Sequence, residues 1–211
     1  MSESQLTAVG STRFVTELRS AKSAFKFCPG APAPPRHTGV GFLSTCPIRP
    51  IRKGWQQDLF DTGRCAAAQF HHHGLWFTGG VVYGWAASSE SNVVKNQTND
   101  LISHVFDQIR FHHGPKFIAG DWNQHPEVLP IHDVLVQHGW IEIQTFAQHR
   151  WGTEPSMTCK QTSRKDFIYV SPEIREWIQA VSVTAEPFPD HAVLTVALSI
   201  PGKPEPPFPY W

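Results

Sequence analysis

Three segments of this chain place acidic, amide or imidazole side chains beside apolar runs that are typical of β-strands. They are Gly120-Asp121-Trp122-Asn123, the nonapeptide 163–171 around Asp166, and Pro189-Asp190-His191 before the apolar run 192–199. A fold in which these strand ends meet would gather several oxygen ligands, which Mg²⁺ and Mn²⁺ prefer, next to one imidazole. The three segments together therefore predict a divalent-metal site for phosphate ester chemistry.

The bulk composition is that of a globular domain of ordinary size. The chain has 211 residues, of which 40% are hydrophobic and 17% charged, so one domain with a substantial core is expected. Eighteen basic residues balance eighteen acidic ones, which removes the usual global argument for a nucleic-acid binder. A local basic patch facing an acidic metal site remains compatible with zero net charge.

Cysteine spacing and hydropathy point to the cell interior. The four cysteines are scattered without a Cys-x-x-Cys pair, so a structural zinc site is not expected. The first residues lack the apolar core of a signal peptide, and no run approaches the ~18 apolar residues of a membrane span. We therefore expect an intracellular protein, cytoplasmic or nuclear, with no membrane partner and with reduced thiols.

Hydrophobic periodicity predicts interspersed helices and strands. The predicted helices span 11–21, 98–112 and 127–138, and a fourth starts at Ser171-Pro172. The predicted strands span 40–43, 64–70, 75–83, 116–120, 140–146, 166–170, 181–185 and 192–199, with His71-His72-His73-Gly74 as a hairpin turn. This order favours an α/β (α+β) domain over residues 1–199, with two sheets packed face to face and helices outside. Residues 200–211 contain five prolines and are interpreted as a linker or tail.

The three segments, in this order, resemble the endonuclease/exonuclease/phosphatase superfamily. Its motifs read Gly-Asp-x-Asn, then Arg-x-Asp-Tyr/Phe-Ile, then Ser-Asp-His; here Pro189 replaces the Ser. The resemblance implies a DNase-I-like fold, a four-layer sandwich of two mixed β-sheets flanked by helices. It also implies a metal-dependent phosphodiesterase that uses Mg²⁺, with Mn²⁺ as a second possibility.

The resemblance assigns roles to individual residues. It implies that Asp121 orients or deprotonates the attacking water, that Asn123 donates to the phosphate, and that Asp166 orients the imidazole of His191 at the scissile phosphate. It implies that Asp190 is a carboxylate of the metal site. Tyr83, in Val81-Val82-Tyr83-Gly84-Trp85, is similar to a phosphate-contacting Tyr in Asn-x-Tyr-x-Pro, although the Asn and the Pro are both replaced.

The start of the chain departs from the pattern of the superfamily. Ser2-Glu3-Ser4-Gln5-Leu6 is similar to a string that carries the main metal ligand, which makes Glu3 the candidate ligand. The strands that come before this ligand would then be lacking. We expect such an N-terminally truncated domain to have weak or no nuclease activity.

Within the superfamily, residues 155–160 (Pro-Ser-Met-Thr-Cys-Lys) and the Pro-rich exit after Ile200 resemble endonuclease domains of LINE-type retroelements. This implies DNA as the partner and a downstream reverse transcriptase domain in a longer polyprotein. The candidate nucleic-acid contacts are Arg49, Arg52 and Lys53 beside Trp55, together with Arg164.

Other interpretations stay open at this point. The domain could be a catalytically inactive remnant, a phosphatase or phospholipid diesterase on the same fold, or a nucleic-acid-binding module that uses the basic loop alone. Locally, Asp121 and Asn123 could form a plain turn, and the basic loop and the His71–His73 run could simply be solvated surface.

Overall fold

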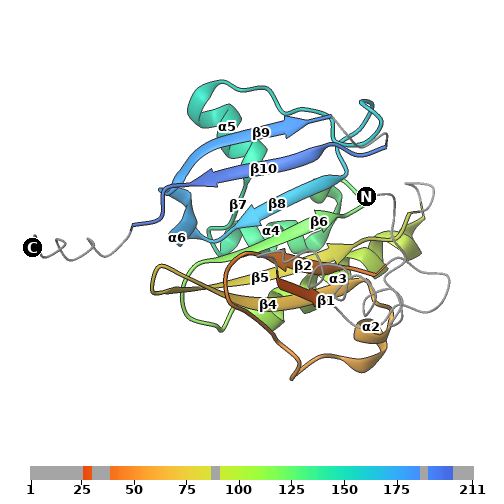
Figure 1. Cartoon of the computed structure of the whole chain (residues 1–211). Helices are drawn as coiled ribbons and strands as arrows, with labels where there is room; N and C mark the ends of the chain where they lie inside the picture. The colour runs from red at the N-terminus through yellow and green to blue at the C-terminus, as the bar shows by residue number, and fades with distance from the viewer. Residues whose placement is uncertain (1–25, 30–38, 87–90, 186–189, 202–211) are drawn as a thin grey trace, which may run out of the picture.

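The computed structural model describes residues 26–29, 39–86, 91–185 and 190–201 (Figure 1). Its centre is a six-stranded mixed sheet with the strand order β3-β4-β5-β6-β8-β7. Only β5 and β6 pair in parallel. The strands are β3 (Ile48–Pro50), β4 (Cys65–His72), β5 (Leu75–Tyr83), β6 (Lys116–Asp121), β7 (Ile141–Glu142) and β8 (Asp166–Val170).

Two antiparallel strand pairs cover one face of this sheet. They are β1 (Lys26–Pro29) with β2 (Gly41–Ser44), and β9 (Ile178–Thr184) with β10 (Val193–Leu198). The first pair packs on Ala66 and Ala68 of β4, the second packs on Ile168 of β8, and Phe117 of β6 contacts both clusters.

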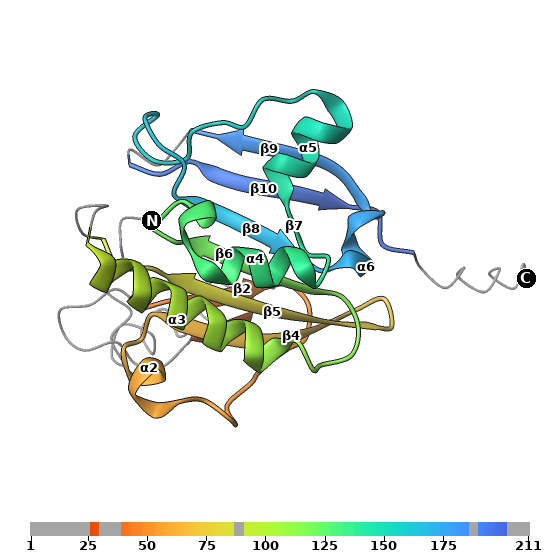
Figure 2. The same cartoon turned by 180° about the vertical axis from the view of Figure 1, so that it is seen from behind.

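Helices cover the opposite face, as Figure 2 shows. Alternate residues of β4 point this way, and Ala67 packs in the cluster formed with α3 (Asn92–Ile109) and α4 (Pro130–Gln137). The predicted apolar stripe of α3 is buried throughout: Leu101, Ile102, Val105, Phe106 and Ile109. None of the helices in the described ranges is both long and apolar enough to cross a membrane.

The strand predicted over 140–146 is wrong. Only Ile141–Glu142 is extended, and α5 (Ile143–Trp151) follows at once. The side chain of Glu142 accepts hydrogen bonds from the backbone N–H groups of Gln144 and Thr145 and so caps this helix. The apolar pattern over 140–146 favours a strand, but the buried carboxylate of Glu142 caps a helix at this point instead.

Smaller differences concern element boundaries. Residues 47–63, which lie between the predicted strands 40–43 and 64–70, contain β3 and α2 (Gln57–Asp61). A 3-10 turn, η1 (Pro126–Val128), comes before α4, and α6 (Pro172–Arg175) is short because Ile178 already belongs to β9. His71 and His72 belong to β4, so the turn is His73-Gly74, with φ of 48° and 79°. The helix predicted over 11–21, Glu3 and residues 202–211 lie outside the described residues.

Candidate functional site

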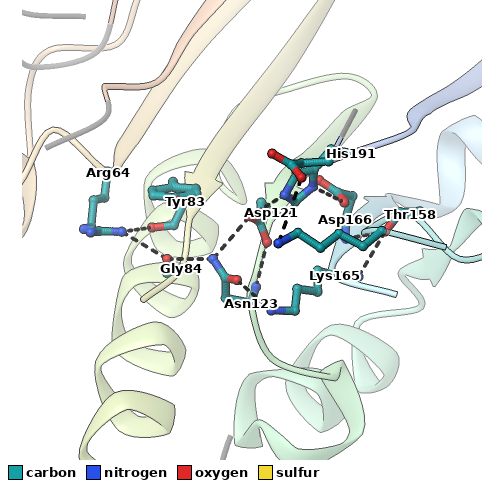
Figure 3. A network of polar contacts seen from close by, with 11 residues as sticks. Arg64, Tyr83, Gly84, Asp121, Asn123, Thr158, Lys165, Asp166 and His191 are labelled. Carbon is teal, nitrogen blue, oxygen red and sulfur yellow. Dashed lines mark hydrogen bonds and ion pairs between the residues drawn. The ribbon is translucent and has the colours of Figure 1, made fainter. Parts of the chain in front are cut away.

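The ends of β5, β6 and β8 meet at one edge of the central sheet. Asp121, the last residue of β6, stands in register with Tyr83 of β5 on one side and with Asp166 of β8 on the other. His191 reaches the same place through a bridge to Cys159. The sheet topology therefore brings Asp121, Asp166 and His191, which are far apart in sequence, into one cluster (Figure 3).

Gly120 allows β6 to approach β5 closely just before the cluster. Its φ is +148°, and a Cβ atom there would lie 1.9 Å from the carbonyl oxygen of Val82. Any side chain would push the two strands apart, so the first glycine of the Gly-Asp-x-Asn motif fixes the position of Asp121.

His191 lies between two carboxylates. Its Nδ1 donates a hydrogen bond to Oδ2 of Asp166 at 2.9 Å, and its Nε2 is 3.8 Å from Oδ2 of Asp121. Thr158 Oγ1 accepts from the backbone N–H groups of Lys165 and Asp166, at 3.0 Å each, and Thr158 O accepts from the N–H of Ala192. Thr158 thus ties the start of β8 to the segment that carries His191.

The carboxylate of Asp121 is the electrostatic centre of the site. Its side chain is only 13% exposed. Burial, and next the charge of Asp166, raise the pKa of Asp121 to about 6, while His191, the N–H of Asn123 and Lys165 act in the opposite direction. The carboxylate is therefore mainly charged at pH 7, although burial destabilises its charged form. A nearby cation, or uptake of a proton, would relieve this destabilisation.

Asn123 closes the turn after β6. Its φ of 54° is a left-handed conformation that Asn tolerates better than most residues. Its backbone N–H donates to Asp121 Oδ1 at 3.0 Å, and its Nδ2 donates to Asp121 Oδ2 and to the carbonyl oxygen of Gly84, both at 3.2 Å. Lys165 Nζ donates to Asn123 Oδ1 at 3.4 Å. Asp121 and Asn123 therefore form a turn, as one interpretation of the sequence held, and the same turn is part of the candidate site.

Sequence reasoning missed Arg64. Its Nη1 donates to the carbonyl oxygens of Tyr83 (3.2 Å) and Gly84 (3.0 Å), and its guanidinium carbon lies 4.9 Å and 5.0 Å from the ring centres of Tyr83 and Trp85. Burial lowers the pKa of Arg64, but an arginine stays charged. The sequence signal that could have found Arg64 is its position directly before β4, because β4 pairs with β5, the strand that ends at Tyr83.

Asp190 does not join the cluster. The carboxylates that accompany His191 are Asp121 and Asp166, whereas the side chain of Asp190 is 68% exposed and lies 3.9 Å from Lys160 Nζ. The side chains of Asp190 and His191 therefore have different surroundings although the residues are neighbours in the chain. Asp190 therefore lies outside the group that Asp121 forms with Asp166 and His191, and its role as a metal ligand stays a prediction.

The predicted nucleic-acid contacts lie away from the cluster or are engaged. Arg49 stacks on Trp76 at 4.4 Å and donates to Gln69; Trp76 is seven residues from Tyr83, which is about 23 Å along β5. Arg52 and Lys53 are exposed between β3 and α2. Arg164 Nη2 is 2.8 Å from Oε2 of the buried Glu142. A role in DNA binding stays a prediction for these four residues.

Comparison with solved structures shows the fold. A single-residue variant of the Neisseria 3′ phosphatase NExo, bound to a product DNA hairpin, matches with a TM-score of 0.66 at 17% identity, covering 88% of this chain and 83% of that one. An AP endonuclease from Archaeoglobus fulgidus matches with a TM-score of 0.60 at 11% identity, covering 88% and 93%. The endonuclease domain of TRAS1, a telomere-specific non-LTR retrotransposon, matches with a TM-score of 0.53 at 13% identity, covering 89% and 91%.

These neighbours are DNase-I-like endonuclease/exonuclease/phosphatase proteins, so the predicted fold is confirmed. No protein-family model and no curated protein sequence matches the chain.

Proposed function

We propose that this DNase-I-like domain is a Mg²⁺-dependent phosphodiester hydrolase that cuts DNA as an endonuclease. The observation that carries the proposal is the pair of contacts made by His191, to Asp166 through Nδ1 and towards Asp121 through Nε2. Nuclease and phosphatase neighbours of the same fold support it.

The residues of the cluster fit a hard divalent cation. Ligand atoms of Asp121, Asp166 and His191 lie within 4.8 Å of one another, and the carboxylate of Asp121 is disfavoured by burial, which a cation would offset. Asp121 would hold the ion within the cluster, and Asp190 and Glu3 remain proposed further ligands. A bound Mg²⁺ would neutralise charge on the phosphoryl oxygens.

Side chains of the site carry out the other parts of the reaction. Asp166 fixes the ring orientation of His191, so that Nε2 faces the reacting phosphate. Asp121, in its ionised form, accepts the proton of the attacking water as the P–O bond to the leaving strand breaks, and the leaving oxygen takes up a proton from solvent. The phenol of Tyr83 acts as a neutral donor to the developing negative charge, and the amide of Asn123 joins it by turning one N–H from Asp121 Oδ2 to the phosphate. Arg64 holds the backbone that carries Tyr83 in place.

The DNA substrate and the retroelement origin are part of the proposal. The TRAS1 domain is a retrotransposon endonuclease of this fold, and a reverse transcriptase domain following residues 200–211 would complete such a polyprotein. The second candidate is a phosphomonoesterase, because NExo is described as a 3′ phosphatase on the same fold.

A plasmid nicking assay with purified protein tests the function. We expect the chain to nick supercoiled DNA only weakly in Mg²⁺ and not at all in EDTA, and His191→Ala to lose even this activity. His113→Ala is the matched control, because His113 is exposed and lies outside the cluster. Release of phosphate from a 3′-phosphorylated oligonucleotide without nicking would favour the phosphomonoesterase. Equal nicking by wild type and His191→Ala would overturn the proposed site.

A further inference from the structure

A cavity of about 500 Å³ lies between α4 and α5 on the helix-covered face of β8. Figure 2 shows both helices on this side of the sheet. We call it the α4–α5 cavity. The rings of Trp140, Phe167 and Tyr169 lie beneath it and are at most 5% exposed, so its accessible apolar lining comes mainly from Val136 of α4 and Phe146 of α5. Its volume falls in the range of about 300–1,000 Å³ that is typical of small-molecule sites.

The polar groups of the cavity are not evenly distributed. At the inner end Arg164 and Glu142 neutralise each other at 2.8 Å, and the buried Nε of Arg164 has no hydrogen-bond partner among the described residues. The inner end therefore offers no free charge to a ligand.

The rim of the cavity favours an anion. His149 is exposed there, and Arg175, 57% exposed, lies 4.0 Å from Glu176 in a surface ion pair that is weak enough for a phosphate to replace. The acidic Glu127 lies 3.7 Å from His125. The apolar side chains of Val136 and Phe146 and a guanidinium at the rim suit a ligand with a flat heterocycle and a phosphate.

The α4–α5 cavity also adjoins the candidate catalytic site. His125 and Arg164 line both this cavity and a neighbouring one of about 440 Å³, which reaches Asn123 and Lys165. Arg164 is two residues before Asp166, a separation of about 6.6 Å along an extended chain.

We propose that the α4–α5 cavity binds a nucleotide, with its base against Val136 and Phe146 and its phosphate at Arg175. The assignment of that nucleotide to the substrate strand, next to the scissile position, rests on the proposed function. A free nucleotide acting as an effector has the same chemistry, so the experiment separates the two sources.

The first arm measures binding of dAMP by calorimetry in the His191→Ala protein, where no reaction intervenes. Val136→Trp fills the cavity from an exposed helix position, 53% exposed, and we expect it to weaken dAMP binding at least tenfold. Val93→Trp, at a 65% exposed position of α3 outside the cavity, is the matched control and should bind dAMP as the parent does. Arg175→Ala should weaken binding of dAMP but not of deoxyadenosine.

The second arm measures KM and kcat for a short DNA oligonucleotide. A rise in KM with unchanged kcat in Val136→Trp assigns the cavity to the substrate strand, whereas loss of dAMP binding with an unchanged KM assigns it to a free nucleotide. Absence of saturable dAMP binding to the parent protein, or equal dAMP affinity in the parent and Val136→Trp, overturns the proposal. Saturable binding without any hydrolysis would contradict the proposed function alone.

Discussion

Oδ2 of Asp166 lies 2.9 Å from Nδ1 of His191, although 25 residues separate them in the chain. The contact exists because β8 begins next to the segment that bridges Cys159 and His191. The hydrogen bond holds one ring nitrogen and leaves Nε2 on the side of Asp121, at 3.8 Å from its carboxylate. A predicted catalytic role for the imidazole depends on this fixed orientation.

Asp166→Asn should lower kcat by about 10²–10⁴ while substrate affinity changes little, because an amide can reverse the donor and acceptor roles and favour the wrong tautomer. Single-turnover rates and equilibrium binding of a DNA oligonucleotide measure the two effects separately. Unchanged turnover would show that His191 needs no orienting carboxylate.

Asp121→Asn should stabilise the fold at neutral pH in EDTA. The raised pKa of Asp121, about 6 against an ordinary 3.8, costs the folded state about 2–3 kcal/mol once the group is ionised. Losses of about 1 kcal/mol from the bonds to Asn123 reduce the gain. We expect Tm to rise by about 2–8 °C at pH 7.5, measured by differential scanning calorimetry.

The difference in stability between Asp121→Asn and the wild type should depend on pH, and this dependence tests the cause more sharply than Tm at one pH. Between pH ~4 and ~6 the folded protein binds more protons at Asp121 than the unfolded chain does, so its contribution to stability falls as pH rises through that window. The advantage of Asp121→Asn should therefore be complete above pH ~6.5 and vanish near pH 4. An advantage that is independent of pH would mean that burial of the charge is not its cause.

Removal of the same carboxylate should also remove the response to metal. In the wild-type protein Mg²⁺ should raise Tm, because an ion bound only by the folded state stabilises it by mass action. Asp121→Asn should show a much smaller rise in Tm, and His113→Ala should respond as the wild type does. Equal shifts in all three proteins would place the ion elsewhere.

The sequence predicted the strand ends and their convergence well, because apolar runs locate β5, β6 and β8 and the polar residue at each end belongs to a sheet edge. It could not predict that Glu142 begins a helix, since this depends on the buried contact with Arg164. Arg64 was not found because its partners come from lateral pairing of β4 with β5. The motif did not show that, of the two neighbours Asp190 and His191, His191 is the one that lies against Asp121 and Asp166.

Arg64→Lys should reduce both stability and turnover. A lysine amine cannot donate to two carbonyl oxygens and stack on two rings in the way the planar guanidinium does. We expect Tm to fall by about 3–6 °C and kcat by about tenfold, since Gly84 O also holds Asn123. Arg110→Lys is the matched control: Arg110 stacks on Phe106 and Phe111 and pairs with Asp107 outside the site. Its kcat should stay at the wild-type value, and an equal loss in both variants would remove Arg64 from the site.

Gly120→Ala should displace Asp121 and lower the free energy of unfolding far more than the same substitution at Gly74, in the turn between β4 and β5. The new methyl group would lie 1.9 Å from the backbone oxygen of Val82, so no side-chain rotation can relieve the clash and β6 must move away from β5. We expect a loss of about 3–5 kcal/mol in unfolding free energy, and at least a hundredfold loss in activity because misplacement by about 1 Å is this costly. Gly74→Ala is the control, because Gly74 has a positive φ of 79° but no atom within 4 Å of the added carbon. Its cost should be about 1 kcal/mol, with normal activity. Chemical denaturation with a nicking assay on both variants makes the comparison, and equal effects would show that close approach of β5 and β6 does not position Asp121.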